Sequence, residues 1–464
     1  MKNYNIVVFS PGSGEGIHFL RSLTPDFVHL HITVDIVYTK TVILMGIPGV
    51  KTGRLAMNKT VVQKFGGSSL STLEHIRSVA SKIKQTRESG ASVAVVVSAM
   101  GGETDRMLEM IHQLNQDPPG REQDCLVATG EQACAALMAA ALENLGCPAR
   151  SFLGLQLPLH TDEAHTRARI ASLEGERIKK ALDEGNVAVV AGFQGINYEG
   201  DITTLGRGGS DTTAVALAAS LKADACEIYT DVDGIYTTDP SICPRAQHLK
   251  RITYEEILEL AGLGAKVLQS RSVELARKFY VPLVVKSSFG GSRGTWIVKE
   301  EDVEMESAVV SGITLDRNEG KLTVIKVPDR PGIAHSVISP LAEASINVDM
   351  IIQNVSSEGY TDFTFTVPAG DLERAREIVE KEAQKIGARE VRSNDAIAKV
   401  SAVGIGMKNH PGVAAKMFQT LSHENINIQM ISTSEIRISC VIDSKYGELA
   451  VRVLHQAFGL DKEN

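Results

Sequence analysis

The stretch that decides the fold is Thr60–Ser98, which reads TVVQKFGGSSLSTLEHIRSVASKIKQTRESGASVAVVVS. Thr60–Phe65 predicts a buried strand that ends at two glycines and two serines, and a helix is expected from Ser71 to about Glu88. Ser92–Ser98 is nearly all valine and alanine, which is typical of a strand covered on both faces of a parallel sheet. A strand, a helix and a second buried strand predict the repeating unit of an α/β fold.

The same alternation continues for some 240 residues and predicts a three-layer α/β/α sandwich with a mainly parallel central sheet. Apolar residues that recur at helical spacing predict helices, and a glycine often marks the helix end. Short apolar runs between these segments predict strands. The expected helices are Thr104–Leu114, Gln123–Leu145, Glu176–Glu184, Thr212–Leu221, Tyr254–Ala261 and Ala265–Lys278, and the expected strands are Val187–Ala191, Ala225–Tyr229, Leu283–Lys286 and Thr295–Val298.

The last 160 residues contain an internal repeat with an offset of 80 residues. The segment DRPGIA at 329–334 matches NHPGVA at 409–414, and INVDMI at 346–351 matches INIQMI at 426–431. Each copy predicts a strand, a Pro-Gly turn, a helix, an Asn-containing turn and a strand. Two small α+β modules of the ferredoxin-like βαββαβ type follow, and their pairing suggests a composite ligand site between them.

Composition narrows the functional classes. The 464 residues suggest about three domains at roughly 150 residues each, and 43% apolar with 22% charged residues is ordinary globular composition. The net charge of −8 does not favour nucleic acid as the main partner. The six cysteines contain no CxxC pair, which predicts reduced thiols in a cytoplasmic protein. No apolar run is long enough to predict a membrane span, and no secretory signal is recognised. The histidines form no HExxH motif.

The first chemical motif is KFGGSS at 64–69, between a strand and a helix. Glycines there let backbone N–H groups approach an anion, and the start of a helix favours negative charge. Lys64 can add a point charge on a phosphoryl group. The alternative is an ordinary strand-to-helix turn, which the glycines alone would not exclude.

The second motif, GRGGSDTT at 206–213, opens another helix. Arg207 can grip a carboxylate through two parallel hydrogen bonds, whereas Asp211 alone would be read as a helix cap. The combination of an arginine and an aspartate beside a Gly-Gly turn favours a ligand site over a purely structural turn.

The third motif, TDVDGIYTTDP at 230–240, follows a buried strand, where open α/β sheets bind ligands, although a plain loop is the competing interpretation. Two single residues add weaker signals. Glu131 in TGE could serve only helix electrostatics. Lys266 in GAKVL is a cation at an expected helix start, which is locally unfavourable and hints at an anionic partner.

Taken together, the chain resembles the aspartokinase family. The motifs KFGGSS, VVVSAMGG (95–102), TGE (129–131), TTLGRGGSDTTA (203–214), TDVDGIYTTDP and GAKVL (264–268) stand in the family's order. The resemblance is to the monofunctional type, with an amino-acid-kinase domain and two C-terminal ACT domains, and covers about 58–460. It implies an extension at 1–57 outside the family match, a catalytic domain at 58–300, a first ACT domain at 318–395, and a second at 396–464 that also takes a strand from about 306–315.

The resemblance implies transfer of the γ-phosphoryl group of ATP to the β-carboxylate of L-aspartate, giving 4-phospho-L-aspartate and ADP for lysine, threonine and methionine synthesis. ATP with Mg²⁺ is the implied co-substrate, and no side chain is assigned to the metal. The implied catalytic residues are Lys64, Asp211 and Lys266. The implied ATP-binding residues are Lys64, Phe65, Gly66, Gly67, Ser210, Thr230, Asp231, Tyr236, Thr237, Asp239, Pro240 and Lys266, and the implied aspartate-binding residues are Ser98, Thr104, Glu131, Arg207, Gly208, Gly209 and Ser210. One departure is Ser241, where related chains often carry an arginine, so the nucleotide contact there is open, with Arg245 four residues on.

The resemblance also implies feedback inhibition by lysine, threonine or both at the ACT pair. The implied effector residues are Asp329, Ala334, Asn347, Asp349, Gln353, Val413, Ala414, Asn427, Ile428, Thr433, Ser434 and Glu435. A homo-oligomer or an α2β2-type assembly through the ACT domains is expected, in the cytoplasm and without nucleic acid or membrane. Which effector acts, the oligomeric state, an internal start for a regulatory subunit and the role of residues 1–56 stay open.

Three other functions compete. A kinase of glutamate or acetylglutamate would not be expected to carry an ACT pair. A regulatory sensor with an inactive kinase domain would be expected to lack Lys64, Asp211 or Lys266, and all three are present. A bifunctional aspartokinase–dehydrogenase would need a further domain after Asn464.

Overall fold

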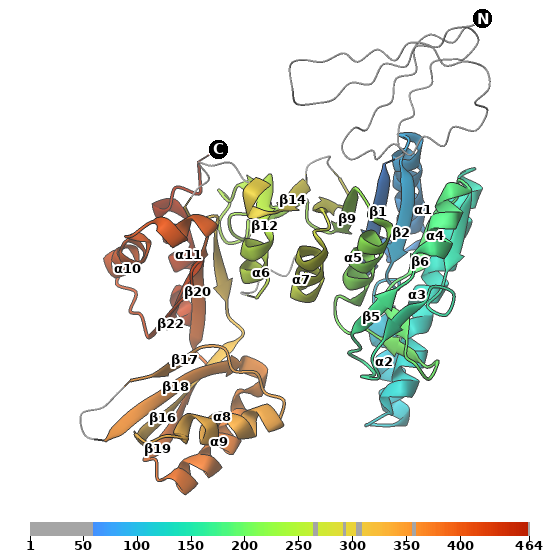
Figure 1. The fold of residues 1–464 in the computed structure, drawn as a ribbon. Coiled ribbons are helices and arrows are strands. Elements are labelled where there is room, and N and C mark those ends of the chain that lie inside the picture. Colours follow the sequence, from blue (N-terminus) through green and yellow to red (C-terminus); the bar gives the residue numbers. More distant parts are fainter. Residues whose placement is uncertain (1–58, 263–267, 291–293, 303–308, 355–358, 463–464) are drawn as a thin grey trace, which may run out of the picture. The chain divides into compact units, whose positions relative to one another are not determined.

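A computed structural model describes residues 59–262, 268–290, 294–302, 309–354 and 359–462 (Figure 1). The extension expected at 1–57 and Lys266 lie outside these residues. Among the described residues, each expected element of the first 300 residues is present, with one shift. The helix expected from Ala265 begins at Ser270 within the described part, because Gln269 before it is extended at ψ 128°.

The described residues up to 302 are built on an eight-stranded sheet. Its strands pair in parallel except for one antiparallel neighbour pair, β13 with β14. The order across the sheet is β12 (Arg251–Thr253), β14 (Gly294–Val298), β13 (Leu283–Ser287), β9 (Ala225–Thr230), β1 (Thr60–Phe65), β2 (Ser92–Val97), β6 (Val187–Ala191) and β3 (Ala149–Phe152).

Helices cover both faces of this sheet, as the valine-rich strands predict. Alternate residues of β2 divide between the two cores: Val93, Val95 and Val97 pack on one face, and Ala94 and Val96 on the other. The first face packs against α1 (Leu73–Glu88) and α3 (Gly120–Asn144), with α2 (Glu103–Leu114) beside α3, and the second against α4 (Glu176–Asp183), α5 (Gly209–Leu221), α6 (Tyr254–Gly262) and α7 (Ser270–Phe279). The three-layer α/β/α sandwich is thereby confirmed.

Helix α3 is long and apolar enough to cross a membrane by length and composition alone. Cys134, Ala135, Met138 and Leu142 on it are buried in the core against the sheet. This helix is therefore read as the core helix of the sandwich.

Two small sheets have no counterpart in the sequence analysis. One orders β5 (Ile170–Leu173), β4 (Leu159–Thr161), β7 (Gln194–Ile196) and β8 (Ile202–Thr204), and the other pairs β10 (Ile235–Tyr236) with β11 (His248–Leu249). Strands of two to four residues carry too little periodicity to be recognised from sequence. The first sheet ends at the turn that carries Arg207, and the second contains part of the TDVDGIYTTDP segment.

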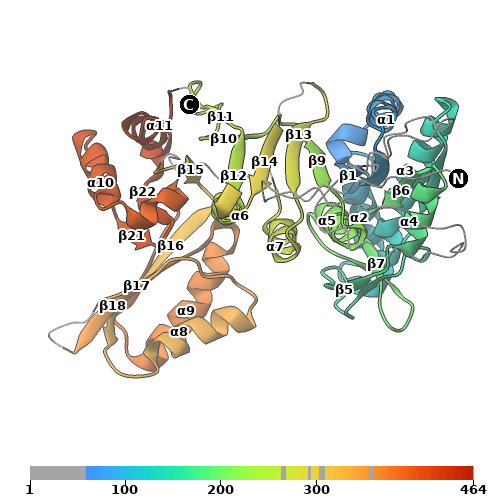
Figure 2. The ribbon, with the colours of Figure 1, turned by 45° about the horizontal axis from the view of Figure 1, so that its top comes forward.

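The repeat forms two four-stranded sheets, each covered by two helices (Figure 2). The first module orders β17 (Ile351–Gln353), β18 (Tyr360–Pro368), β16 (Glu319–Pro328) and β19 (Glu390–Asn394), with α8 (Ile333–Glu343) and α9 (Leu372–Ile386). The second orders β15 (Gly312–Asp316), β20 (Ile397–Val403), β22 (Arg437–Asp443) and β21 (Met430–Thr433), with α10 (Val413–His423) and α11 (Gly447–Ala457). Strand β15 precedes the first module in the chain yet pairs with β20, so the first module is inserted within the second.

Candidate active site and effector site

The centre of the candidate active site is an ion pair between two of the sequence motifs. Lys64 lies near the carboxyl end of the central strand β1, and Asp211 lies in the first turn of α5. The Lys64 Nζ and Asp211 Oδ1 atoms are 2.6 Å apart, and the two side chains are 12% and 11% exposed. An ammonium group has three donors, so this pair orients Lys64 and leaves donors for an anion.

Glycines beside Lys64 keep the space around its ammonium group open. A Cβ atom added at Gly66 would lie 3.2 Å from Lys64 Nζ, and one at Gly67 would lie 3.1 Å from the carbonyl oxygen of Ala99. Gly208, at the start of α5, has a φ of +69°, and a Cβ there would overlap the side chain of Gln269. The turn before α5 thus requires glycine at Gly208, whereas the turn after β1 leaves little room for a side chain at Gly66 or Gly67.

Glu131 is the third charged residue of the site, and it lies in the middle of α3 rather than at its start. Its side chain is buried at 3% exposure. The backbone N–H of Ala99 donates to its Oε1 at 2.9 Å, while Oε2 is buried and finds no partner among the residues that the structure describes. Burial raises the pKa of Glu131 to about 7. A buried carboxylate with a free oxygen is suited to receive a cationic group.

The other residues assigned to the aspartate lie at the end of β2 and at the starts of α2 and α5. Ser98 directly follows β2, and its backbone N–H donates to the carbonyl of Phe65 at the end of β1. Thr104 is in the first turn of α2, and Ser210 is buried in the first turn of α5. Arg207 is exposed in the turn between β8 and α5 and has no ion pair within the described chain. The exposed guanidinium is therefore available to a ligand.

A cavity of about 920 Å³ lies along the TDVDGIYTTDP segment. Asp231, Tyr236, Asp239 and Pro240 line it, as assigned from sequence, whereas Thr230 and Thr237 do not. Phe65 was also assigned to the nucleotide, but its side chain is fully buried and stacks on Tyr229 at 4.5 Å. Only the backbone of Phe65 lies at the strand end.

Ser241 and Arg245 have local partners. The backbone N–H and hydroxyl of Ser241 donate to Asp239 Oδ1 at 2.8 and 2.7 Å, which fixes the turn after Pro240. Arg245 does not line the cavity and lies 3.8 Å from Asp461. Arg245 therefore does not take the place of an arginine at position 241 in this structure.

The cavity also has walls that the sequence analysis missed. They come from α6, from the end of β13 and the loop after it, and from β15 of the second module: Leu260, Ser287, Phe289, Gly290, Ile313, Thr314 and Leu315. No local motif marks these residues, because they reach the cavity through the packing of distant segments.

The residues assigned to the effector site fall on the matching turns of the two modules. Asn347 and Asn427 are exposed in equivalent turns before β17 and β21. Met350 and Met430, three residues after these asparagines, share a small core with Ile397 and Val441, and so bring the two turns together. Glu435 instead contacts Lys408 at 3.6 Å. The remaining assigned residues, Asp329, Ala334, Gln353, Val413, Ala414, Ile428, Thr433 and Ser434, are exposed or half-buried.

Asp349 belongs to a charged cluster that the sequence analysis did not anticipate. Lys399 on β20 is 3% exposed and contacts Glu319 Oε1 and Asp349 Oδ2, each at 2.5 Å, with Asp316 at 3.6 Å. Burial would lower the pKa of Lys399, but its hydrogen bonds to the two carboxylates outweigh burial and raise it. The one sequence feature that could have indicated this cluster is the single lysine within the mainly apolar strand Ile397–Val403.

A second lysine makes the reciprocal contact. Lys321 on β16 donates to Gln429 Oε1 at 2.5 Å. Gln429 is the residue that matches Asp349 in the repeat. Each module therefore directs a lysine from its sheet at the same position of the other module, where one module has a carboxylate and the other a neutral amide.

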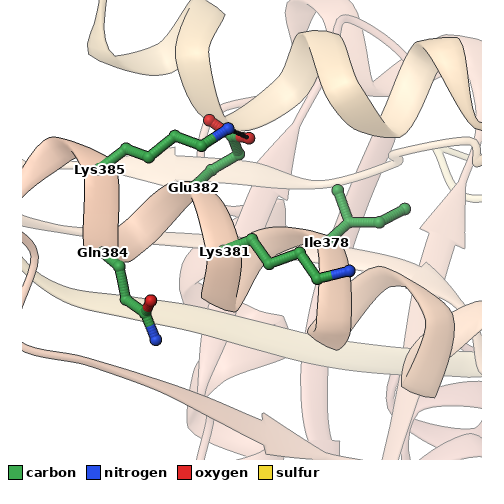
Figure 3. A pocket seen from close by; sticks show the side chains of 5 residues that line it. All are labelled: Ile378, Lys381, Glu382, Gln384 and Lys385. Atoms are coloured by element: carbon green, nitrogen blue, oxygen red, sulfur yellow. Dashed lines mark hydrogen bonds and ion pairs between the residues drawn. The ribbon is translucent and has the colours of Figure 1, made fainter.

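A separate shallow hollow on α9 contains none of the assigned residues. Figure 3 shows Lys385 and Glu382 pointing toward each other, with Gln384 pointing away. Lys385 Nζ lies 2.5 Å from Glu382 Oε1. These contacts are those of an ordinary solvated helix face.

Groups of three or more histidine, cysteine, aspartate or glutamate side chains suited to a metal ion are absent from the described ranges. In kinases a magnesium ion commonly accompanies the substrate phosphates, with few direct protein ligands. Asp211, the carboxylate next to Lys64, is paired with that lysine.

Comparisons with known proteins show which families the chain is similar to. Residues 59–287 match the amino acid kinase family, and 321–384 and 400–458 match two ACT domain families. The aspartate kinase Ask_LysC of Stutzerimonas stutzeri is 54% identical over 401 residues, covering 86% of this chain and 97% of that protein. The crystal structure of E. coli aspartokinase III in complex with aspartate and ADP has a TM-score of 0.69 at 26% identity, over 86% of this chain and 99% of that one. The complex of the same enzyme with lysine and aspartate has a TM-score of 0.68 at 26% identity, over the same shares.

Proposed function

The chain belongs to the aspartate kinase family, and from this premise we propose that it transfers the γ-phosphoryl group of ATP to the β-carboxylate of L-aspartate. The products would be 4-phospho-L-aspartate and ADP, in the first step toward lysine, threonine and methionine. The observation that carries the proposal is the Lys64–Asp211 ion pair of 2.6 Å at the carboxyl end of the central strand. This ion pair positions the ammonium group of Lys64 beside Gly66 and Gly67, where backbone N–H groups can approach a phosphate.

At the phosphoryl end, we assign charge neutralisation to Lys64, oriented by Asp211. Phosphoryl transfer requires positioning and stabilisation of charge more than covalent help from the protein. The N–H groups at Gly66 and Gly67 add donors, and the open space around Gly66 supports that role. Lys266, outside the described residues, remains the proposed second lysine. Mg²⁺ would accompany ATP and neutralise charge on its phosphates.

At the aspartate end, we assign the α-ammonium group to Glu131 and the α-carboxylate to Arg207. The free, buried Oε2 atom of Glu131 supports the first assignment. The exposed guanidinium of Arg207 beside the glycines of α5 supports the second. Ser98, Thr104 and Ser210 would line the space between them. No general base is needed, because a β-carboxylate is already ionised at pH 7.

The test is aspartate-dependent ATP turnover by the purified full chain, with hydroxylamine trapping of the acyl phosphate. Glutamate and acetylglutamate serve as alternative acceptors. We expect trapped product with aspartate alone. Turnover with one of the other acceptors instead would reassign the substrate, and no turnover with any acceptor would refute the kinase assignment.

We further propose that lysine, threonine or both inhibit the enzyme at the paired ACT modules. Polar turns from both modules meet around Met350 and Met430, and Asp349 offers a carboxylate at that junction. An effector inhibits only if it binds the less active state more tightly. Turnover measured with each amino acid alone and with both distinguishes single from concerted inhibition. Inhibition by neither would refute this part.

We also propose assembly through the ACT modules, either as a homo-oligomer or with a shorter regulatory subunit, in the cytoplasm. The edge strands β17 and β21 present exposed Ile351 and Ile431, which suit pairing with a further chain. Light scattering of the purified chain tests this proposal, and a monomer at micromolar concentration would contradict it.

A further inference from the structure

The nucleotide segment of the kinase domain is held by the second ACT module. The backbone N–H of Ile313 on β15 donates to the carbonyl of Thr237 at 2.8 Å. From α11, His455 Nε2 lies 2.8 Å from the Thr237 hydroxyl, which also accepts from the backbone N–H of Gln247 at 2.9 Å. Thr237 and His455 are both buried, at 5% and 1% exposure. The loop that follows the nucleotide-binding strand is thus fixed by two elements of the regulatory part.

Strand β15 also forms one wall of the cavity itself. Ile313 packs in the core of the second module, and Leu315 packs against it. Because side chains alternate along a strand, Thr314 faces the opposite side of the sheet, the side on which Val403 of β20 packs into the core of the kinase domain. All three residues line the cavity, together with Tyr236, Asp239 and Leu260. The cavity is therefore shared by the two domains.

The Thr314 hydroxyl has no assigned partner. Thr314 is 8% exposed, and its Oγ1 atom is buried without a hydrogen bond to any residue of the described chain. Buried hydroxyl groups are nearly always hydrogen-bonded, so an unpaired one at the wall of a binding cavity points to a ligand. The β-branched side chain can present its hydroxyl to the cavity by a rotation about χ1.

The position of β15 indicates which part of the nucleotide it would meet. The phosphates are expected at Lys64 and Gly66, at the end of β1. The cavity near β15 is lined by apolar side chains, including Ile235, Ile242 and Leu260, which suit a base and not a phosphate. We propose that Thr314 of the second ACT module hydrogen-bonds the adenosine part of ATP and ADP, so that this module completes the nucleotide site.

This inference rests on the proposed kinase function and adds a residue from the regulatory part to it. Its test uses the full chain and titrates ADP by isothermal calorimetry. Thr314→Val removes the hydroxyl at nearly constant volume, and we expect ADP to bind about fivefold more weakly, the effect of one hydrogen bond. Thr314→Ser keeps the hydroxyl and is expected to bind ADP as the wild type does. Thr314→Ala is a second variant without the hydroxyl.

Three controls separate a ligand contact from a structural role. The KM for aspartate at saturating ATP should stay unchanged, thermal stability without nucleotide should not fall in Thr314→Val, and inorganic tripolyphosphate should inhibit all variants equally. Unchanged ADP binding in Thr314→Val would overturn the inference alone. Equal weakening of ADP and tripolyphosphate would also overturn it, by showing a general distortion. A wild-type chain that binds no ADP would instead refute the proposed function.

Discussion

Two lysine–carboxylate contacts, one in the kinase domain and one between the ACT modules, are built for opposite purposes. Lys64 contacts one carboxylate, Asp211, and both side chains keep about a tenth of their exposure. Lys399 is 3% exposed and contacts Glu319 and Asp349 at hydrogen-bonding distance, with Asp316 nearby. The donors of an ammonium group are nearly used up in the second case and largely free in the first.

The difference teaches how to tell a ligand site from a structural joint when both hold a lysine and an aspartate. In the kinase domain, glycines keep space open beside the lysine, and a second buried carboxylate, Glu131, has an oxygen to spare. Between the modules, Lys399 joins residues of both repeats. We propose that the first arrangement binds charged groups of a substrate, whereas the second neutralises charge within the chain.

The largest expected effect comes from removing the kinase lysine. Lys64→Met should lower kcat on the order of 10³-fold, because one preorganised charge on the transferring group is lost. Some stability should be lost as well, because the buried carboxylate of Asp211 is left without its cation. Aspartate-dependent ADP release measures kcat, and Lys59→Met, at an exposed position just before β1, is the matched control. A loss below tenfold would place Lys64 outside the chemistry.

Removing the regulatory lysine should give the reverse pattern. Lys399→Met leaves Glu319 and Asp349 without their cation and should lower the free energy of unfolding by about 3 kcal/mol, as when a buried ion pair loses one partner. The kcat without effector should stay within about twofold, while the response to lysine and threonine weakens. Urea denaturation measures the unfolding free energy. A large loss of kcat with unchanged stability would contradict the structural role.

Glu131 sharpens the comparison through pH. Because burial raises its pKa to about 7, the carboxyl group is protonated below that pH and ionised above it in the free enzyme. Only the ionised form attracts the aspartate ammonium group, so the KM for aspartate should fall as pH rises from 6 to 8. Glu131→Gln should raise the KM about 10- to 100-fold and abolish this pH dependence. A variant that keeps the wild-type pH profile would assign the titration to another group.

The smallest effect should come from the neutral half of the ACT pair. Lys321→Met removes a hydrogen bond to an amide, not an ion pair, and should cost only about 1 kcal/mol of unfolding free energy. Comparing it with Lys399→Met under the same urea protocol tests whether charge at position 349 makes the two halves unequal. Equal losses of unfolding free energy in the two variants would show that the two matching contacts contribute equally to stability.

The sequence predicted the parts of the fold that depend on local pattern. The valine-rich strands, the glycine turns beside Lys64 and Asp211, and the repeat that contains Asn347 and Asn427 all carry their signal within a few residues. The ion pair itself joins positions in different motifs, and the parallel sheet explains why they meet at one edge.

What sequence reasoning missed depends on contacts between distant segments. The roles of Thr314 and Lys399 arise from the packing of β15 and β20, and neither residue belongs to a recognisable motif. The small strands β4, β5, β7 and β8 are too short to show a period. Glu131 was found, but its place at the middle of α3, with one oxygen bound and one free, required coordinates.

The insertion of the first module between β15 and β20 constrains the order in which the chain can fold during synthesis on the ribosome. The register that pairs Asp316 with Lys399 cannot form until every residue between them has been synthesised. Strand β15, which forms one wall of the cavity, therefore stays without its partner strand until the inserted module has folded and brought its two ends together. Rapid folding of that module would shorten the time for which β15 is unpaired and able to pair with another chain.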